Sequence, residues 1–66
     1  MSEIEWETHT ATVEDLEGAS TLTYLVNPSE NTAVVLASDD VEHERAKVLR
    51  QRMLLPMFSQ VVIKRT

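Results

Sequence analysis

One segment of the chain has a helical pattern with a start signal and a stop signal. Asp39, followed three residues later by Glu42, predicts an N-terminal cap. Pro56 disfavours helical geometry in the residue before it, so we predict a helix over residues 40–54. Because strand-like runs precede and follow this helix, it must act as a crossover that leaves the last strand parallel to the one before it.

The other patterned segments are typical of strands. Residues 4–13 alternate apolar or threonine side chains with Glu or His. Residues 20–26 place Leu22, Tyr24 and Val26 on one face and Thr21, Thr23 and Leu25 on the other. Residues 32–37 are a continuous apolar run, which predicts a strand covered on both faces or one at a buried edge. A last strand is predicted over residues 59–65.

Two connections and one irregularity follow from the same reading. Residues 14–19 contain Gly18, the only glycine, and are predicted to be a loop. Residues 27–31 contain Pro28 and predict a chain reversal. The apolar positions of the first strand change phase between Trp6 and Ala11, so we predict a bulge or a break between them, near His9.

These elements predict an α+β fold over a single domain, residues 1–66. It is a single-layer sheet of about four strands in the order β-β-β-α-β, an antiparallel meander plus a final parallel strand, with one helix packed on one face. We prefer a pairing of the last strand with the first, although the third strand is an alternative partner. The predicted apolar face of the helix spans a half-turn arc into which Arg45 and Arg52 intrude; it consists of Val41, Ala46, Val48, Leu49, Met53 and Leu55.

The charges are segregated along the chain. All eleven acidic residues lie between Glu3 and Glu44, and all six basic residues lie between Arg45 and Arg65. Internal neutralisation is the favoured explanation, because acids suit the start of a helix and bases suit its end. With the last strand beside the first, Arg50 and Arg52 would lie near Glu3, Glu5 and Glu7, and Lys64 and Arg65 would lie near Glu14, Asp15 and Glu17. The alternative is that each charged region faces a partner.

Two charged surfaces are therefore candidate binding sites. The candidate acidic interaction surface comprises Glu3, Glu5, Glu7, Glu14, Asp15 and Glu17. The candidate basic patch comprises Arg45, Lys47, Arg50, Arg52, Lys64 and Arg65. Within it, Arg45 and Arg52 lie two helical turns apart and could form a fork for an anion, although long arginine stems commonly lie across apolar surface instead.

No pattern indicates catalysis, a metal site or a cofactor. The chain has no cysteine and two histidines, so a zinc site would depend on carboxylates. Asp39 with His43, and Glu7 with His9, each offer only two ligands. A single glycine cannot form a phosphate cradle. We therefore expect a protein that is not an enzyme and that has no cofactor.

The apolar content exceeds what one helix can cover. Leu25, Val34, Leu36 and Val62 are predicted to lie on the other face of the sheet and form a candidate apolar interface. A chain of 66 residues buries only about 60% of its unfolded surface, so stabilisation by self-association or a partner is expected.

The predicted function is a small acidic protein-interaction module, an adaptor, regulator or inhibitor that acts by surface complementarity. It is expected to act as a homo-oligomer, with a homodimer favoured, or in a complex with a protein partner. The alternatives are a nucleic-acid-binding protein that uses the basic patch, or an acidic mimic of nucleic acid. Glutamates near the start and the lack of a long apolar run predict a soluble, cytoplasmic protein without a membrane partner.

Overall fold

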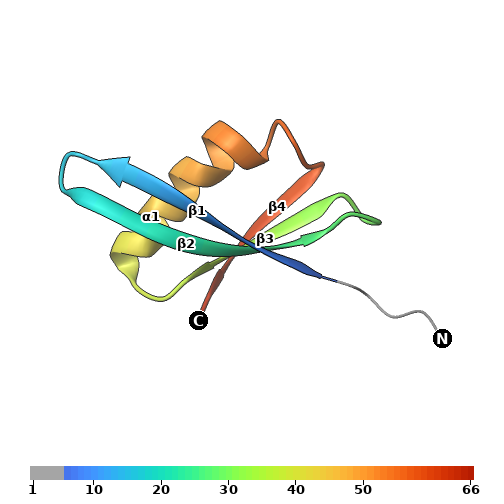
Figure 1. Ribbon diagram of the computed structural model, residues 1–66, viewed down its shortest axis with the longest axis horizontal. Coiled ribbons are helices and arrows are strands. Elements are labelled where there is room, and N and C mark those ends of the chain that lie inside the picture. Colours follow the sequence, from blue (N-terminus) through green and yellow to red (C-terminus); the bar gives the residue numbers. More distant parts are fainter. Residues whose placement is uncertain (1–5) are drawn as a thin grey trace.

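Four strands form one mixed sheet with a helix on one face (Figure 1). The computed structural model describes residues 6–66. The strands lie in the spatial order β1-β2-β3-β4; β1, β2 and β3 are antiparallel neighbours, and β4 is parallel to β3. The predicted α+β architecture is confirmed. The strands are β1 (Glu7–Asp15), β2 (Gly18–Asn27), β3 (Thr32–Ala37) and β4 (Gln60–Arg65).

The preferred pairing of the last strand with the first is wrong, because β4 lies beside β3. Adjacent strands are about 4.8 Å apart, so the crossover from β3 to its free side moves by one spacing. A position outside β1 would require about three spacings. The structure has the shorter connection, and β3 becomes an interior strand that is covered by the helix on one face only.

The two hairpin turns are fixed by local side-chain hydrogen bonds. The first strand extends to Asp15, which pairs with Gly18, so the connection is shorter than the predicted loop. Asp15 Oδ1 accepts a hydrogen bond from the main-chain N–H of Glu17 at 2.8 Å, and Gly18 has φ +144°. The predicted reversal after β2 is confirmed: Asn27 Oδ1 accepts from the N–H of Glu30 at 3.3 Å.

The bulge predicted near His9 is absent from β1. Every residue from Glu7 to Asp15 pairs in continuous register with β2. Trp6 precedes the strand and is 41% exposed, so its phase places no constraint on the pairing. Residue 4, the other member of that predicted phase, lies outside the described residues.

The helix begins as predicted and changes its pitch near its end. α1 (Asp40–Leu49) starts after Asp39, whose Oδ1 accepts from the N–H of Glu42 at 2.8 Å. The helix continues as a π-helical turn, η1 (Arg50–Leu54), in which the N–H of Leu55 donates to the carbonyl of Arg50 at 2.8 Å.

The π turn corrects the predicted apolar face. In a regular α-helix, Met53 would lie on the same face as Leu49, four residues earlier. The wider turn instead buries Leu54, five residues after Leu49, and leaves Met53 47% exposed. Ala46 and Leu49 are buried as predicted, whereas the remaining members of the predicted face, Val41, Val48 and Leu55, are exposed.

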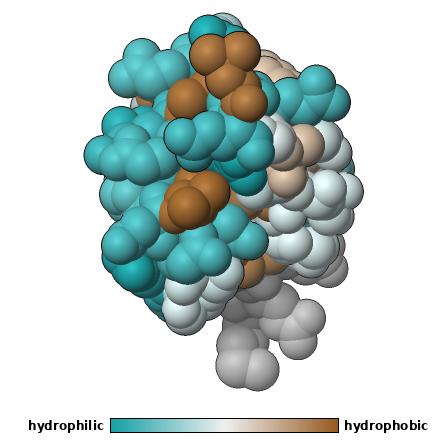
Figure 2. Space-filling model, turned by 90° about the vertical axis from the view of Figure 1, so that its left-hand side faces the viewer, coloured by the Kyte–Doolittle hydropathy of each residue, from teal (hydrophilic) through white to brown (hydrophobic). Residues whose placement is uncertain are grey.

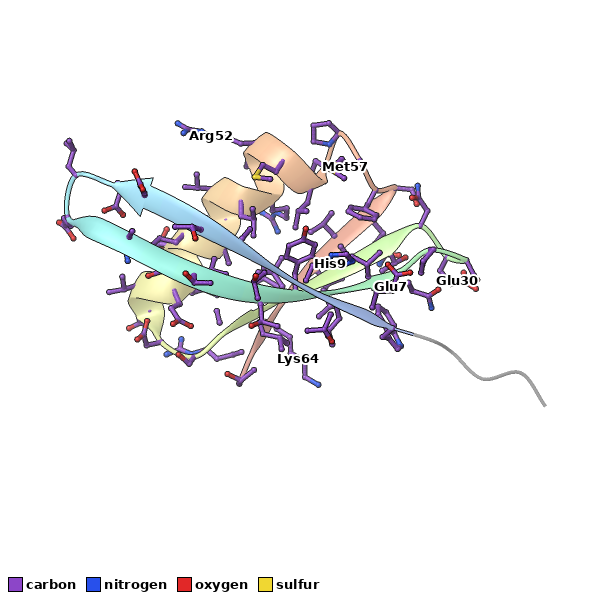
Figure 3. All side chains as sticks on the ribbon, viewed as in Figure 1. Glu7, His9, Glu30, Arg52, Met57 and Lys64 are labelled. Carbon is purple, nitrogen blue, oxygen red and sulfur yellow. The ribbon has the colours of Figure 1, made fainter. Side chains whose placement is uncertain are left out.

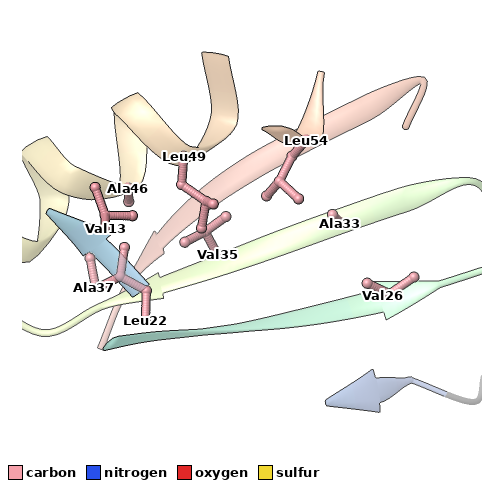
Figure 4. Close-up of a cluster of buried hydrophobic side chains, with 9 residues drawn as sticks. All are labelled: Val13, Leu22, Val26, Ala33, Val35, Ala37, Ala46, Leu49 and Leu54. Atoms are coloured by element: carbon pink, nitrogen blue, oxygen red, sulfur yellow. The ribbon is translucent and has the colours of Figure 1, made fainter. Parts of the chain in front are cut away.

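The core lies between the helix and one face of the sheet (Figure 4). β3 contributes Ala33, Val35 and Ala37, which are fully buried. The predicted faces of β2 are confirmed, because Leu22 and Val26, which were predicted to share one face, both lie in this core. The buried cluster comprises Val13, Leu22, Val26, Ala33, Val35, Ala37, Ala46, Leu49 and Leu54.

Candidate functional site

The sheet face opposite the helix brings the predicted apolar interface together. Directly paired residues share a sheet face, so the pairs Leu25–Val34 and Val34–Val62 form one row across β2, β3 and β4. Leu36 follows two residues after Val34 and points to the same side. We call the surface formed by Leu25, Val34, Leu36 and Val62 the open face. No helix or strand among residues 6–66 packs on it.

The open face is partly exposed and has a polar border. Leu25, Val34 and Leu36 are half-buried by their neighbours, and Val62 is 42% exposed. Lys64 pairs with Leu36 on one side. On the other side, threonines of β1 and β2 continue the face, with Thr8 opposite Leu25, Thr10 opposite Thr23 and Thr12 opposite Thr21. This arrangement suits contact with another protein surface better than the enclosure of a small molecule.

The predicted acidic residues do not form one surface within residues 6–66. Glu7 lies at the start of β1 and Glu14 near its end, and seven residues of strand span about 23 Å. Asp15 is paired with Arg45, and Glu17 lies in the adjacent turn. Glu3 and Glu5 lie outside the described residues.

The predicted basic residues do not converge either. Arg45 is buried, Lys47 pairs with Glu44 at 3.4 Å, and Arg65 pairs with Asp40 at 2.8 Å. Arg52 and Lys64 project on opposite sides of the molecule, and Arg50 is half-buried in η1 (Figure 3).

The predicted neutralisation of Lys64 and Arg65 by the end of β1 is therefore wrong. β4 ends beside β3, where Thr66 donates its main-chain N–H to Ala37 at 2.9 Å. That position is next to the start of α1, so Arg65 pairs with Asp40 instead. The expected approach of Arg52 to Glu7 is also wrong, because Arg52 lines a cavity together with Glu14, which lies at the other end of β1 from Glu7.

Arg45 and Asp15 form the principal ion pair of the structure. Arg45 Nε lies 2.9 Å from Asp15 Oδ2, and Arg45 Nη2 lies 3.1 Å from Asp15 Oδ1, which is a bidentate contact. Arg45 also donates to the hydroxyl of Ser20. Hydrogen bonds from Arg45, and then from the N–H of Glu17, lower the pKa of Asp15. The sequence signal for this contact was an arginine inside the apolar arc of the helix.

Because Arg45 already donates to Asp15 and Ser20, few of its N–H groups are left to bind an anion in the predicted fork. Arg45 and Arg52 both line a cavity of about 550 Å³ between the helix and the end of β1, but the guanidinium of Arg45 is bound to Asp15. Glu14 and Glu44 also line this cavity, together with the exposed Leu16 and Val48. Figure 2 looks at this end of the molecule and shows separate apolar patches among hydrophilic ones.

The two predicted pairs of metal ligands remain pairs. Glu7 Oε1 lies 3.2 Å from His9 Nε2, and the ring of His9 stacks on Tyr24 at 5.4 Å between centroids. Asp39 uses its carboxylate to cap the helix that carries His43. Within residues 6–66, no three His, Asp or Glu side chains gather as a potential metal site.

No protein-family model matches the chain, and comparison with curated proteins and with solved structures found no similar protein. Among the described residues, no helix has both the length and the apolar character needed to span a membrane.

Proposed function

We propose that this protein is a small protein-interaction module that binds a protein partner through the open face. It acts by surface complementarity, as an adaptor, regulator or inhibitor, and not by chemistry. The observation that carries the proposal is the row Leu25–Val34–Val62, which crosses three adjacent strands on the side away from the helix. An apolar patch with a polar border is the usual anatomy of a protein interface.

The charge distribution supports a protein partner over nucleic acid. A nucleic-acid binder needs several cations on one surface, because the released counterions supply much of its affinity. Here Arg45, Lys47 and Arg65 are in ion pairs, and Arg52 and Lys64 project on opposite sides. An acidic mimic of nucleic acid needs regularly spaced carboxylates, and Glu7 and Glu14 are about 23 Å apart.

The proposal is tested by adding one positive charge at two positions on the same side of the sheet. Leu25→Lys places a charge inside the apolar row, whereas Thr12→Lys places it on the threonine border. Proteins captured by the wild type are identified, purified and titrated against all three proteins. We expect one partner whose affinity falls at least tenfold with Leu25→Lys and changes little with Thr12→Lys.

Two results would contradict the proposal. One is equal binding of the purified partner by the wild type and the folded Leu25→Lys variant. The other is binding to DNA or RNA at low salt that weakens steeply as salt rises, because that dependence is the mark of phosphate contacts.

A further inference from the structure

The two edges of the sheet differ in how they are protected against pairing with another strand. Edge strands present unpaired main-chain groups, and proteins commonly protect them with charges, proline or bulges. β1 has Glu7 near one end and Glu14 and Asp15 at the other. β4 has no acidic residue and no proline; its two cations, Lys64 and Arg65, lie together at its C-terminal end, where Arg65 is paired with Asp40. Its central residues, Val61, Val62 and Ile63, are all apolar.

The direction of the main-chain groups in β4 follows from its last hydrogen bond. Thr66 donates its N–H to Ala37 of β3 at 2.9 Å. Main-chain groups alternate in direction along a strand, so Val62 and Lys64 also bond to β3, while the N–H and C=O groups of Val61 and Ile63 point outward. No strand among residues 6–66 pairs with them.

We infer that β4 pairs antiparallel with β4 of a second copy of this chain, about a two-fold axis through Val62. In this register Val61 lies opposite the partner's Ile63, and Ile63 lies opposite the partner's Val61. Both residues have outward main-chain groups, so each of these two pairs exchanges two hydrogen bonds. Val62 lies opposite its own copy as a pair without hydrogen bonds. The result is one continuous sheet across two chains.

Side-chain chemistry selects this register. On the open face, Val62 meets the partner's Val62, which joins the two apolar rows. On the helix face, the half-buried Val61 and Ile63 cover each other. If the two-fold axis passed through Ile63 instead of Val62, Lys64 would lie opposite the partner's Val62. The contact between two valines would then be replaced by contacts between a valine and a cation.

The charges also favour the antiparallel arrangement. Lys64 lies opposite the partner's Gln60, and the two Lys64 residues are about 13 Å apart along the strands, beyond the screening length of about 8 Å at physiological salt. A parallel pairing would place them side by side. Pairing of β1 with its own copy about Ala11 would oppose Glu7 and Asp15, two like charges.

This inference extends the proposed function without resting on it, because the β4 edge and the open face share only Val62. Two variants, Val61→Pro and Leu25→Lys, separate the two surfaces, and a third changes the residue that they share. Val61→Pro removes one outward N–H and no bond to β3. Val62→Lys opposes two cations at the two-fold axis. Leu25→Lys changes the open face away from the edge.

Sedimentation at several concentrations is expected to show wild-type mass rising to twice that of the chain and no further. The dissociation constant should rise at least tenfold for Val61→Pro and Val62→Lys and change little for Leu25→Lys. A wild type that stays monomeric overturns the inference. So does an intact dimer in folded Val61→Pro, or a dimer lost only in Leu25→Lys. Mass that grows beyond twice the chain would indicate head-to-tail pairing of β4 with β1, and also overturns it.

A second measurement holds even if Val61→Pro does not fold. The chain has no cysteine, so Val62→Cys introduces a single thiol. Directly opposed residues without hydrogen bonds have Cα atoms about 4.5 Å apart, within the ~4.4–6.8 Å span of a disulfide. We expect mild oxidation to give a covalent dimer from Val62→Cys and not from Leu25→Cys. Equal cross-linking of the two variants would overturn the inference.

Discussion

The π-helical turn determines which of two neighbouring side chains stabilises the core. Leu54 is fully buried, whereas Met53 exposes 47% of its surface. Removal of a buried leucine side chain to alanine costs about 3–5 kcal/mol, because burial is lost and a cavity remains. For the half-exposed Met53, the loss should be about 1 kcal/mol. We therefore predict that Leu54→Ala lowers the free energy of unfolding several times more than Met53→Ala.

The expected loss is large relative to the total. At roughly 0.05–0.15 kcal/mol per residue, a chain of 66 residues has a stability of about 3–10 kcal/mol. Each kcal/mol corresponds to about 4–8 °C in a domain of this size, so Leu54→Ala should lower the melting temperature by at least about 12 °C. Urea and thermal unfolding followed by circular dichroism measure both variants.

The matched pair makes the result decisive. The two residues are adjacent in η1, so a general disturbance of this turn would affect both variants alike. An unfolded Leu54→Ala with a folded Met53→Ala meets the expectation. If Met53→Ala is instead the more destabilising change, the description of η1 is wrong. That result would mean that the helix keeps its regular α-helical pitch, because Met53 then lies on the same buried face as Leu49, four residues earlier.

Three further changes test other parts of the fold. In the folded state Arg45 lowers the pKa of Asp15. The ion pair therefore stabilises the folded state fully at pH values above the ordinary carboxyl pKa, and this stabilisation is lost as the pH falls through the lowered pKa of Asp15. Urea midpoints should therefore fall more steeply below about pH 4 in the wild type than in Asp15→Asn, and equal slopes would contradict the pairing. Gly18→Ala should lower the free energy of unfolding by about 1–3 kcal/mol, because Gly18 has φ +144°. The added Cβ would lie 3.8 Å from Arg45, an ordinary van der Waals distance, so the cost comes from the backbone conformation. An unchanged melting temperature would contradict this conformation. Asp39→Ala should cost about 0.5–2 kcal/mol as a lost helix cap, and Asp39→Ser should recover most of it; an equal loss in both would contradict the capping role.

Local signals in the sequence predict the elements well because they depend on a few neighbouring atoms. The cap at Asp39 and the turn that begins at Asn27 each require one side-chain oxygen near a specific N–H, and both contacts are present. The alternation in β2 likewise identifies Leu22 and Val26 as core residues. Each of these predictions needs no knowledge of the distant chain.

Predictions that depend on the whole molecule were less accurate. The parallel direction of β4 follows from the crossover alone, but β1 and β3 satisfy it equally, and the shorter connection decides between them. The π turn has no recognisable signal in residues 50–54, yet it changes the direction of the side chains that follow. As a result Leu54 is buried and Met53 is exposed, the reverse of what a regular α-helix predicts. For Arg45 the sequence predicts a place in a basic surface patch. In the structure Arg45 is buried, because the β1–β2 hairpin brings Asp15 and Ser20 close enough to accept its hydrogen bonds.

The order of charges along the chain becomes an asymmetry between the two edges of the sheet. The acids precede the bases, and the first and last strands form the edges, so β1 receives carboxylates and β4 receives none. The cations of β4, Lys64 and Arg65, lie at one end of the strand and leave Val61, Val62 and Ile63 without a charge between them. In a closed two-fold pair the acidic β1 edges would be the outer edges of the combined sheet, where like charges oppose further growth. Segregated charge would then limit assembly to two chains instead of steering the protein to a charged partner.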